Sequence, residues 1–233
     1  MRHGRIASLV ALAASLAACG GGGGGNTTVS QNVGANLSIP FAQLFQQFVS
    51  TQHSWNVNLN YIFAGQTYTG TGTFSQSAAS PISINGRSLL SYTQTGTFTL
   101  SGNGKTVPYS LSSQTLLDSN YNVLGSYGSG SYCQTTSYNL LPTTVSVGST
   151  GVLSNSTCYN DQAMTQLQGY DTTSYSVVAN SSSAVTVNIT DNETLNGALV
   201  SDDIETYTVT PTSVSLVSSS STGPNSTLTA TVF

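Results

Sequence analysis

The chain has 233 residues, of which only 5% are charged, and its formal net charge at pH 7 is −4. That length suits one ordinary domain or two small ones. After residue 18, all eight acidic residues remain but only two basic ones, Arg87 and Lys105. Nucleic-acid interfaces and polybasic membrane patches both need clustered Lys and Arg, so the composition excludes these two functions.

Residues 1–18 have the form of a secretory signal peptide. Arg2 and Arg5 make a short basic head, and residues 6–18 are apolar or small except for two serines. A helix of this length rises about 20 Å, which is too short for a hydrocarbon core roughly 30 Å thick. We therefore expect this segment to be removed from the mature protein.

The sequence Leu16-Ala17-Ala18-Cys19 resembles the lipobox of bacterial lipoproteins. The resemblance implies that Cys19 becomes the first mature residue and carries a lipid. The alternative is an ordinary cleavage site with a chance cysteine beside it. Gly20, rather than Asp, follows the cysteine, which is similar to lipoproteins sent to the outer membrane of Gram-negative bacteria. The resemblance covers the first twenty residues only. It implies a lipid anchor in that membrane and leaves open the periplasmic or the surface side.

Residues 19–37 predict a flexible tether, since they begin with the lipidated cysteine and six consecutive glycines. A glycine-rich chain spans about 5–6 Å × √n, so the tether reaches on the order of 20–25 Å. Residues 38–233 are then expected to form a single folded domain.

Residues 40–50 predict a short amphipathic helix. Its apolar side chains follow the spacing of one helical face. They are Phe41, Leu44, Phe45, Phe48 and Val49. Ser38 is a candidate N-cap, and Pro40 suits the first turn. The polar face carries glutamine instead of the basic residues of a membrane-surface helix, so we expect the helix to cover the apolar side of the domain.

From residue 55 the hydrophobic period changes to two, which predicts β-strands. Apolar residues alternate with asparagine over residues 55–61, and similar alternation recurs up to Phe233. The Gly102-Asn103-Gly104 segment predicts a tight hairpin, because Asn-Gly tolerates the positive φ of such turns. Strands at this spacing predict an all-β, antiparallel fold.

Glycines inside the predicted strands, at Gly70, Gly72 and Gly96, favour a strongly curved sheet with bulges or sharp coiling. Two architectures remain open: a half-barrel wrapped around the helix, or a two-layer sandwich.

Cys133 and Cys158 are expected to form a disulfide, because Cys19 is taken by lipid and the envelope is oxidising. The bond would close a loop of about 25 residues and contribute roughly 3 kcal/mol in the chain-entropy model. Two free reactive thiols are the alternative.

The sequence does not predict an enzyme or a cofactor. His53, the histidine nearest the first strand, is expected to be an exposed linker residue. The chain has no G-x-S-x-G motif, and Lys105 adjoins the predicted hairpin turn. A carboxylate-based hydrolase is the remaining catalytic alternative.

Five of the eight acidic residues fall within residues 191–205. Calcium prefers such oxygen ligands, so this group is a weak calcium candidate. The calcium-loop pattern D-x-[DN]-x-[DN]-G is missing, and an acidic run of this kind usually lies in a solvated loop, so we expect no metal. The five residues are Asp191, Glu193, Asp202, Asp203 and Glu205.

Two functions remain. The first is a structural or interaction module that contacts an envelope protein or glycan through polar sheet faces and exposed tyrosines. The second is a carrier or sensor that binds a lipid-like hydrophobic ligand in the curved sheet. Its candidate ligand-binding residues are Trp55, Tyr61, Phe74 and Phe98.

Overall fold

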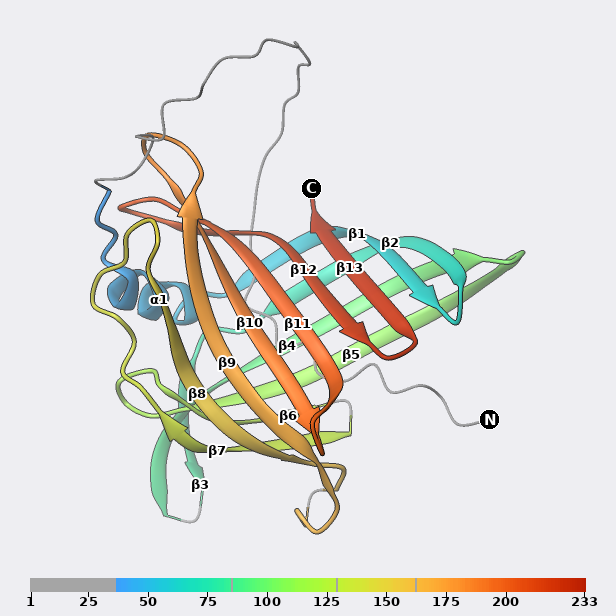
Figure 1. Ribbon diagram of the computed structural model, residues 1–233, viewed down its shortest axis with the longest axis horizontal. Helices are drawn as coiled ribbons and strands as arrows, with labels where there is room; N and C mark the ends of the chain where they lie inside the picture. Colours follow the sequence, from blue (N-terminus) through green and yellow to red (C-terminus); the bar gives the residue numbers. More distant parts are fainter. Residues whose placement is uncertain (1–36, 85, 129, 162) are drawn as a thin grey trace.

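The computed structural model describes residues 37–84, 86–128, 130–161 and 163–233. In these residues one helix, α1 (Phe41–Val49), precedes 13 strands that form one antiparallel sheet (Figure 1). The predicted signal peptide, the lipidation site at Cys19 and the tether as far as residue 36 lie outside the described residues. The strands are β1 (His53–Phe63), β2 (Gln66–Gln76), β3 (Ser80–Ile84), β4 (Arg87–Gly102), β5 (Lys105–Leu117), β6 (Val123–Gly128), β7 (Ser131–Tyr138), β8 (Thr150–Tyr159), β9 (Leu167–Ala179), β10 (Val185–Leu195), β11 (Ala198–Val209), β12 (Val214–Gly223) and β13 (Ser226–Val232).

The sheet closes on itself. From β4 to β13 each strand pairs with the next one in the chain, β13 pairs with β1, and β2 pairs with both β1 and β4. The result is an up-and-down barrel of 12 strands, from which β3 projects because it pairs only with the start of β4 (Figure 1). The prediction of an antiparallel β fold with one short helix is confirmed. The sheet curves further than the half-barrel or sandwich that we expected, and closure pairs the edges that either of those would leave open.

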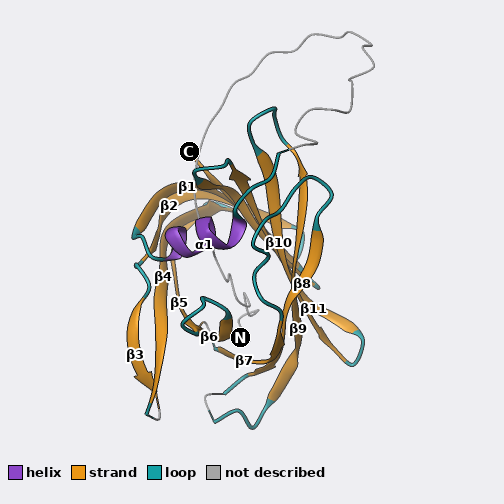
Figure 2. Cartoon of the chain, turned by 90° about the vertical axis from the view of Figure 1, so that its left-hand side faces the viewer, coloured by secondary structure: helices purple, strands orange, loops and turns teal. Residues whose placement is uncertain are grey.

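Helix α1 lies across one end of the barrel, inside the ring of strands (Figure 2). All five residues of the predicted apolar face are buried. The expected cap at Ser38 is wrong: Pro40 occupies the N-cap position and no side chain caps the helix. The segment just before the helix is fixed by Ile39, which forms two backbone hydrogen bonds of 2.9 Å with Val145. No helix among the described residues is long and apolar enough to cross a membrane.

Two of the strand glycines, Gly72 and Gly96, make room for an aromatic ring. The registers of β2 with β1 and with β4 run without interruption past Gly70, Gly72 and Gly96, so of the two alternatives, bulges and sharp coiling, no bulge forms at these positions. A side chain at Gly72 or Gly96 would collide with the ring of Phe98, which lies over both positions. These glycines therefore let a large aromatic side chain lie flat against the inner wall.

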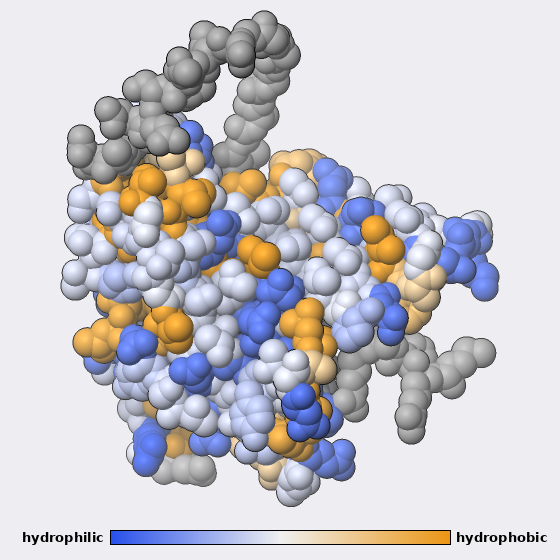
Figure 3. Space-filling view, in the orientation of Figure 1, coloured by the Kyte–Doolittle hydropathy of each residue, from blue (hydrophilic) through white to orange (hydrophobic). Residues whose placement is uncertain are grey.

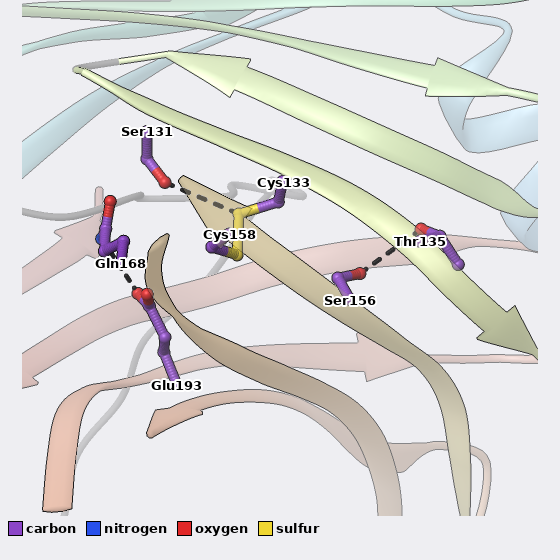
Figure 4. The surroundings of a disulfide bond; sticks show 7 residues. All are labelled: Ser131, Cys133, Thr135, Ser156, Cys158, Gln168 and Glu193. Atoms are coloured by element: carbon purple, nitrogen blue, oxygen red, sulfur yellow. Dashed lines mark hydrogen bonds between the residues drawn. A yellow bond between two sulfur atoms is a disulfide. The ribbon is translucent and has the colours of Figure 1, made fainter. Parts of the chain in front are cut away.

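Two local predictions are confirmed. Asn103 and Gly104 have positive φ values of 51° and 71° and form the turn between β4 and β5. Cys133 and Cys158 form a disulfide and are directly opposed residues of β7 and β8 (Figure 4). The disulfide therefore fixes the register of two neighbouring strands in the barrel wall.

Candidate functional site

The inner face of the barrel changes from apolar to acidic along β9, β10 and β11. The strand registers place the inward residues in rows that run across these three strands. The two rows nearest α1 include Tyr207 and Tyr175, whose rings lie 6.2 Å from Phe48 and 6.3 Å from Phe41. From the α1 end, the rows are Val177–Val187–Tyr207, Tyr175–Ile189–Glu205, Thr173–Asp191–Asp203 and Asp171–Glu193–Ser201.

Four of the five clustered acidic residues therefore face the interior of the barrel. Glu193, Asp203 and Glu205 are buried and Asp191 is half-buried, so the expectation of a solvated loop is wrong for these four. In β10 and β11 inward and outward residues alternate. The four acidic side chains occupy inward positions because this alternation continues from the apolar part of each strand into the acidic part. Asp202 falls on the opposite face of β11, between buried neighbours.

Sequence reasoning missed the fifth interior carboxyl group, Asp171. It lies on β9, directly opposite Glu193 of β10. It is 20 residues before the cluster, and only the pairing of β9 with β10 brings it there. The period-two pattern of β9, in which Tyr175 and Val177 follow at even spacing, is the signal that could have placed it on the inner face. Asp171, Asp191, Glu193, Asp203 and Glu205 are called the carboxyl cluster below.

A cavity of about 90 Å³ lies between α1 and the carboxyl cluster. Phe41 and Phe45 of α1 line one side, and three carboxyl groups of the cluster line the other. These three are Asp171, Asp191 and Glu205. Tyr92 of β4, Cys133 of the disulfide and small side chains of β6 and β8 complete the wall. The cavity thus joins an aromatic side and an acidic side.

The turn at residues 118–122 also lines the cavity, as do the end of β7 and the loop after it at residues 138–141, and the turn is held by several hydrogen bonds. Asp118 accepts hydrogen bonds from the backbone N–H groups of Asn120 and Asn122, at 2.7 and 2.9 Å. The hydroxyl groups of Tyr121 and Ser50 lie 2.9 Å apart, which links this turn to the end of α1. The helix and the turn therefore form a connected rim.

Burial raises the pKa values of four of the five carboxyl groups in the cluster, Asp171, Asp191, Glu193 and Asp203. Burial, together with the charges of neighbouring carboxylates, raises the pKa of both Asp171 and Asp203 to about 8. Burial raises the pKa of Asp191 to about 6, against the effect of a hydrogen bond from Thr173. Burial also raises the pKa of Glu193. These side chains therefore retain protons closer to neutral pH than ordinary carboxyl groups do.

Part of the cluster lacks hydrogen-bond partners within the described residues. Gln168 donates to Glu193 Oε2 at 3.2 Å (Figure 4), but Glu193 Oε1 and Asp203 Oδ1 accept no hydrogen bond. These two side chains are only 4% and 5% exposed. Arg87 and Lys105 are exposed, and in the described part of the chain no basic side chain lines the cavity. A buried carboxyl group without a partner is unfavourable, so the cluster is suited to receive a hydrogen-bond donor.

The four aromatic residues predicted to bind ligand lie elsewhere in the barrel. Trp55, Phe74 and Phe98 are buried, and Tyr61 is half-buried. Phe74 and Phe98 line a second cavity of about 20 Å³, which has room for about one water molecule. None of the four lines the larger cavity. They are spread along the part of the barrel wall formed by β1, β2 and β4, whereas the carboxyl cluster lies on β9, β10 and β11.

His53 is part of β1 and not an exposed linker residue. Its ring stacks between those of Phe48 and Trp55, with centroids 4.3 and 5.2 Å away. Its Nε2 atom lies 2.9 Å from the backbone oxygen of Phe48. These contacts assign His53 to the junction between α1 and the barrel wall.

The carboxyl groups do not converge on one point. Across the described ranges, no group of three or more His, Cys, Asp and Glu side chains is arranged to hold a metal ion. The cluster instead extends over three rows and three strands. This distribution fits a ligand with an extended polar surface better than it fits a single metal ion.

Comparison with known proteins gives no precedent for this cavity. The interpretation of the site therefore depends on its own geometry and charge. No protein-family model, curated protein or solved structure matches this chain.

Proposed function

We propose that this chain is a small-molecule-binding lipoprotein of the bacterial envelope, which acts as a carrier or sensor. The observation that carries the proposal is the cavity of about 90 Å³ beneath α1. Ligand sites are typically concave, largely apolar and fitted with a few polar groups that orient the ligand. Phe41 and Phe45 supply the apolar side here, and three carboxyl groups supply the polar side. We expect binding without turnover.

The polar outer face of the barrel supports a location of the domain in the aqueous phase next to the membrane. The outward residues of β1 include Asn56, Asn58 and Asn60, and those of β2 and β4 are largely threonine. Figure 3 shows one face of the molecule, where polar surface predominates and apolar residues form separate patches. Strands that face lipid in outer-membrane barrels carry apolar residues instead. We therefore propose that Cys19 tethers a water-immersed barrel to the outer membrane.

A second candidate function, an interaction module for an envelope protein or glycan, is favoured by exposed side chains near the cavity. Leu140 is 73% exposed, and Tyr138 and Val152 are 44% and 41% exposed. Asn139 donates a hydrogen bond to the backbone oxygen of Val152 at 2.8 Å, so the two segments lie together. This function predicts that cross-linkers placed at Leu140 in intact cells capture a defined envelope component, whereas a cross-linker at Ser110 does not.

The carrier proposal is tested by purifying the Cys19→Ser chain without detergent and identifying bound molecules by native mass spectrometry and solvent extraction. A second chain also carries Ser154→Leu, which adds bulk to the cavity wall, where Ser154 is buried. The matched control carries Ser110→Leu, because Ser110 is exposed on β5.

We expect a stoichiometric ligand in the Cys19→Ser chain and in the Ser110→Leu control, and loss of the ligand in the Ser154→Leu chain. Circular dichroism checks that all three chains are folded. A folded Cys19→Ser chain that yields no ligand, and that takes up no member of a panel of neutral and charged small molecules, contradicts the proposal and favours the interaction module.

A further inference from the structure

We infer that the ligand of the cavity is an organic ammonium ion, with its cationic group among the carboxyl groups and its apolar part against α1. The inference rests on the proposed binding function and specifies the ligand class. It starts from the three carboxyl groups that line the cavity, Asp171, Asp191 and Glu205. Such groups favour a cation, and the described residues offer no basic side chain in the lining.

The aromatic side of the cavity distinguishes an organic cation from a metal ion. Phe41 and Phe45 belong to α1, their ring centroids lie 6.1 Å apart, and both face the cavity together with Tyr92. Aromatic faces attract ammonium groups and also bury hydrocarbon, whereas a hydrated metal ion gains little from them. Within the described residues, the carboxyl groups also lack the convergence that a metal ion needs.

An independent observation points to a missing donor. Asp203 is paired with Asp191 across β10 and β11, and its Oδ1 atom accepts no hydrogen bond from the described residues although the side chain is 5% exposed. Glu193 Oε1, in the next row of inward residues, is also buried and accepts no hydrogen bond from the described residues. Neither of these two side chains lines the cavity, so their oxygens show that the protein supplies few donors to this end of the barrel. An ammonium group carries N–H donors and a charge, which it can offer to the neighbouring carboxyl groups that do line the cavity.

Ligand binding should release protons. Without a cation, the pKa of Asp171 is raised to about 8 and that of Asp191 to about 6 by burial, with further repulsion from their neighbours in the case of Asp171. The groups that face them are Glu193, Asp203 and Glu205, with Tyr92 and Tyr207. An ammonium ion favours the ionised carboxylates, whereas its own pKa, near 10 like that of lysine, keeps it charged at pH 8. Affinity should therefore rise with pH from about 5.5 to about 8.

The test compares three probes of equal chain length on the Cys19→Ser protein: butylamine, 1-butanol and butyrate. A cavity of about 90 Å³ holds a chain of this size. Binding is measured by NMR shift titration at pH 8 and pH 5.5, and by calorimetry in two buffers of different ionisation enthalpy to count released protons. Asp191→Asn removes one carboxyl group from the lining. Asp202→Asn, on the outward face of β11, is the matched control.

We expect butylamine to bind at least roughly tenfold more tightly than 1-butanol at pH 8, as a charge-assisted hydrogen bond implies. Asp191→Asn should abolish most of this preference, Asp202→Asn should preserve it, and binding at pH 8 should release protons. Equal binding of amine and alcohol overturns the inference but leaves the binding function intact. Binding of Ca²⁺ that displaces the amine at lower concentration also overturns it. Failure of all three probes and of Ca²⁺ to bind overturns this inference, and the proposed function falls with it only if the extraction and the wider panel described above also give no ligand.

Discussion

Asp191 of β10 and Asp203 of β11 lie directly opposite each other on the inner face of the barrel. Directly opposed residues of antiparallel strands have Cβ atoms about 4.5–5.5 Å apart, and like charges in such pairs are destabilising. Each side chain also has one hydroxyl partner, Thr173 for Asp191 and Ser221 for Asp203. The pair avoids repulsion when at least one of its carboxyl groups holds a proton, so the stability of the barrel depends on pH.

We expect the protein to lose stability as pH rises from about 4 to about 8. The folded-state pKa is raised to about 8 for Asp203 and about 6 for Asp191, from 3.8. The folded chain therefore binds more protons than the unfolded chain across this window. The resulting stabilisation is complete below pH 4 and is lost as pH passes 8. Calorimetry should show a Tm about 5–10 °C lower at pH 8.5 than at pH 5. A Tm that rises over this range contradicts the burial of these groups.

The substitution Asp203→Asn should raise the Tm at pH 8.5 by several degrees and change it little at pH 5. Asparagine keeps the shape of the side chain but cannot ionise, so it removes the repulsion with Asp191. Asp202→Asn is the matched control, because Asp202 points away from the interior of the barrel. Equal effects of the two substitutions would show that net charge, and not the buried pair, controls the pH dependence.

Removal of the disulfide through Cys133→Ser and Cys158→Ser should reduce the free energy of unfolding by about 3 kcal/mol. The bond closes a loop of 25 residues and joins directly opposed residues of β7 and β8. Urea denaturation measures the change, and reduction of the wild-type protein with a thiol should reproduce it. A loss below 1 kcal/mol would show that strand pairing alone holds this part of the wall.

The substitution Phe45→Ala in α1 should reduce the free energy of unfolding by about 3–5 kcal/mol, because it removes a buried aromatic side chain. Phe45 is 8% exposed, packs near Phe41 and lines the cavity. Gln43→Ala on the exposed face of the same helix should change stability by less than about 0.5 kcal/mol. Similar small effects of both substitutions would mean that α1 contributes little to closing the barrel end.

The substitution Gly96→Ala should destabilise the protein by about 1–3 kcal/mol, the range typical of overpacking. Replacement of a strand glycine by alanine normally stabilises the strand. A loss of stability here would therefore indicate that the added methyl group has no room. The added methyl group would collide with the ring of Phe98. Phe98→Leu in the same chain should recover part of the loss in a double-mutant cycle. A stabilising effect of Gly96→Ala alone would show that the ring moves aside freely.

Much of the secondary structure follows from local patterns. The apolar residues of α1 follow the helical period, and the prediction of residues 40–50 differs from the observed Phe41–Val49 by one residue at each end. The turn at Asn103 and Gly104 depends on backbone conformations that few residue types adopt. The disulfide follows from a count of cysteines. Each of these features is decided by neighbours in the chain or by residue chemistry.

The candidate site could be predicted only in part. The sequence placed Asp191, Glu193, Asp203 and Glu205 within one short stretch, but the same stretch suggested a solvated loop. Charged residues usually lie in water, so local patterns favour exposure even where the alternation of a strand continues. Asp171 entered the cluster only through the pairing of β9 with β10. The aromatic residues of the cavity come from α1, β4, the turn before β6 and the end of β7, which are far apart in the sequence.

Residue patterns along the chain are sufficient to predict the length and amphipathic character of α1, the antiparallel strands and the cysteine pairing. The tertiary structure decided that the sheet closes through the pairing of β13 with β1 and of β2 with β4. It also decided which face of each strand lies inside. Local propensity specifies the period of a strand but not its partner, because pairing depends on contacts between distant segments. Closure is what converts an acidic stretch of sequence into the carboxyl lining of a cavity beneath an aromatic helix.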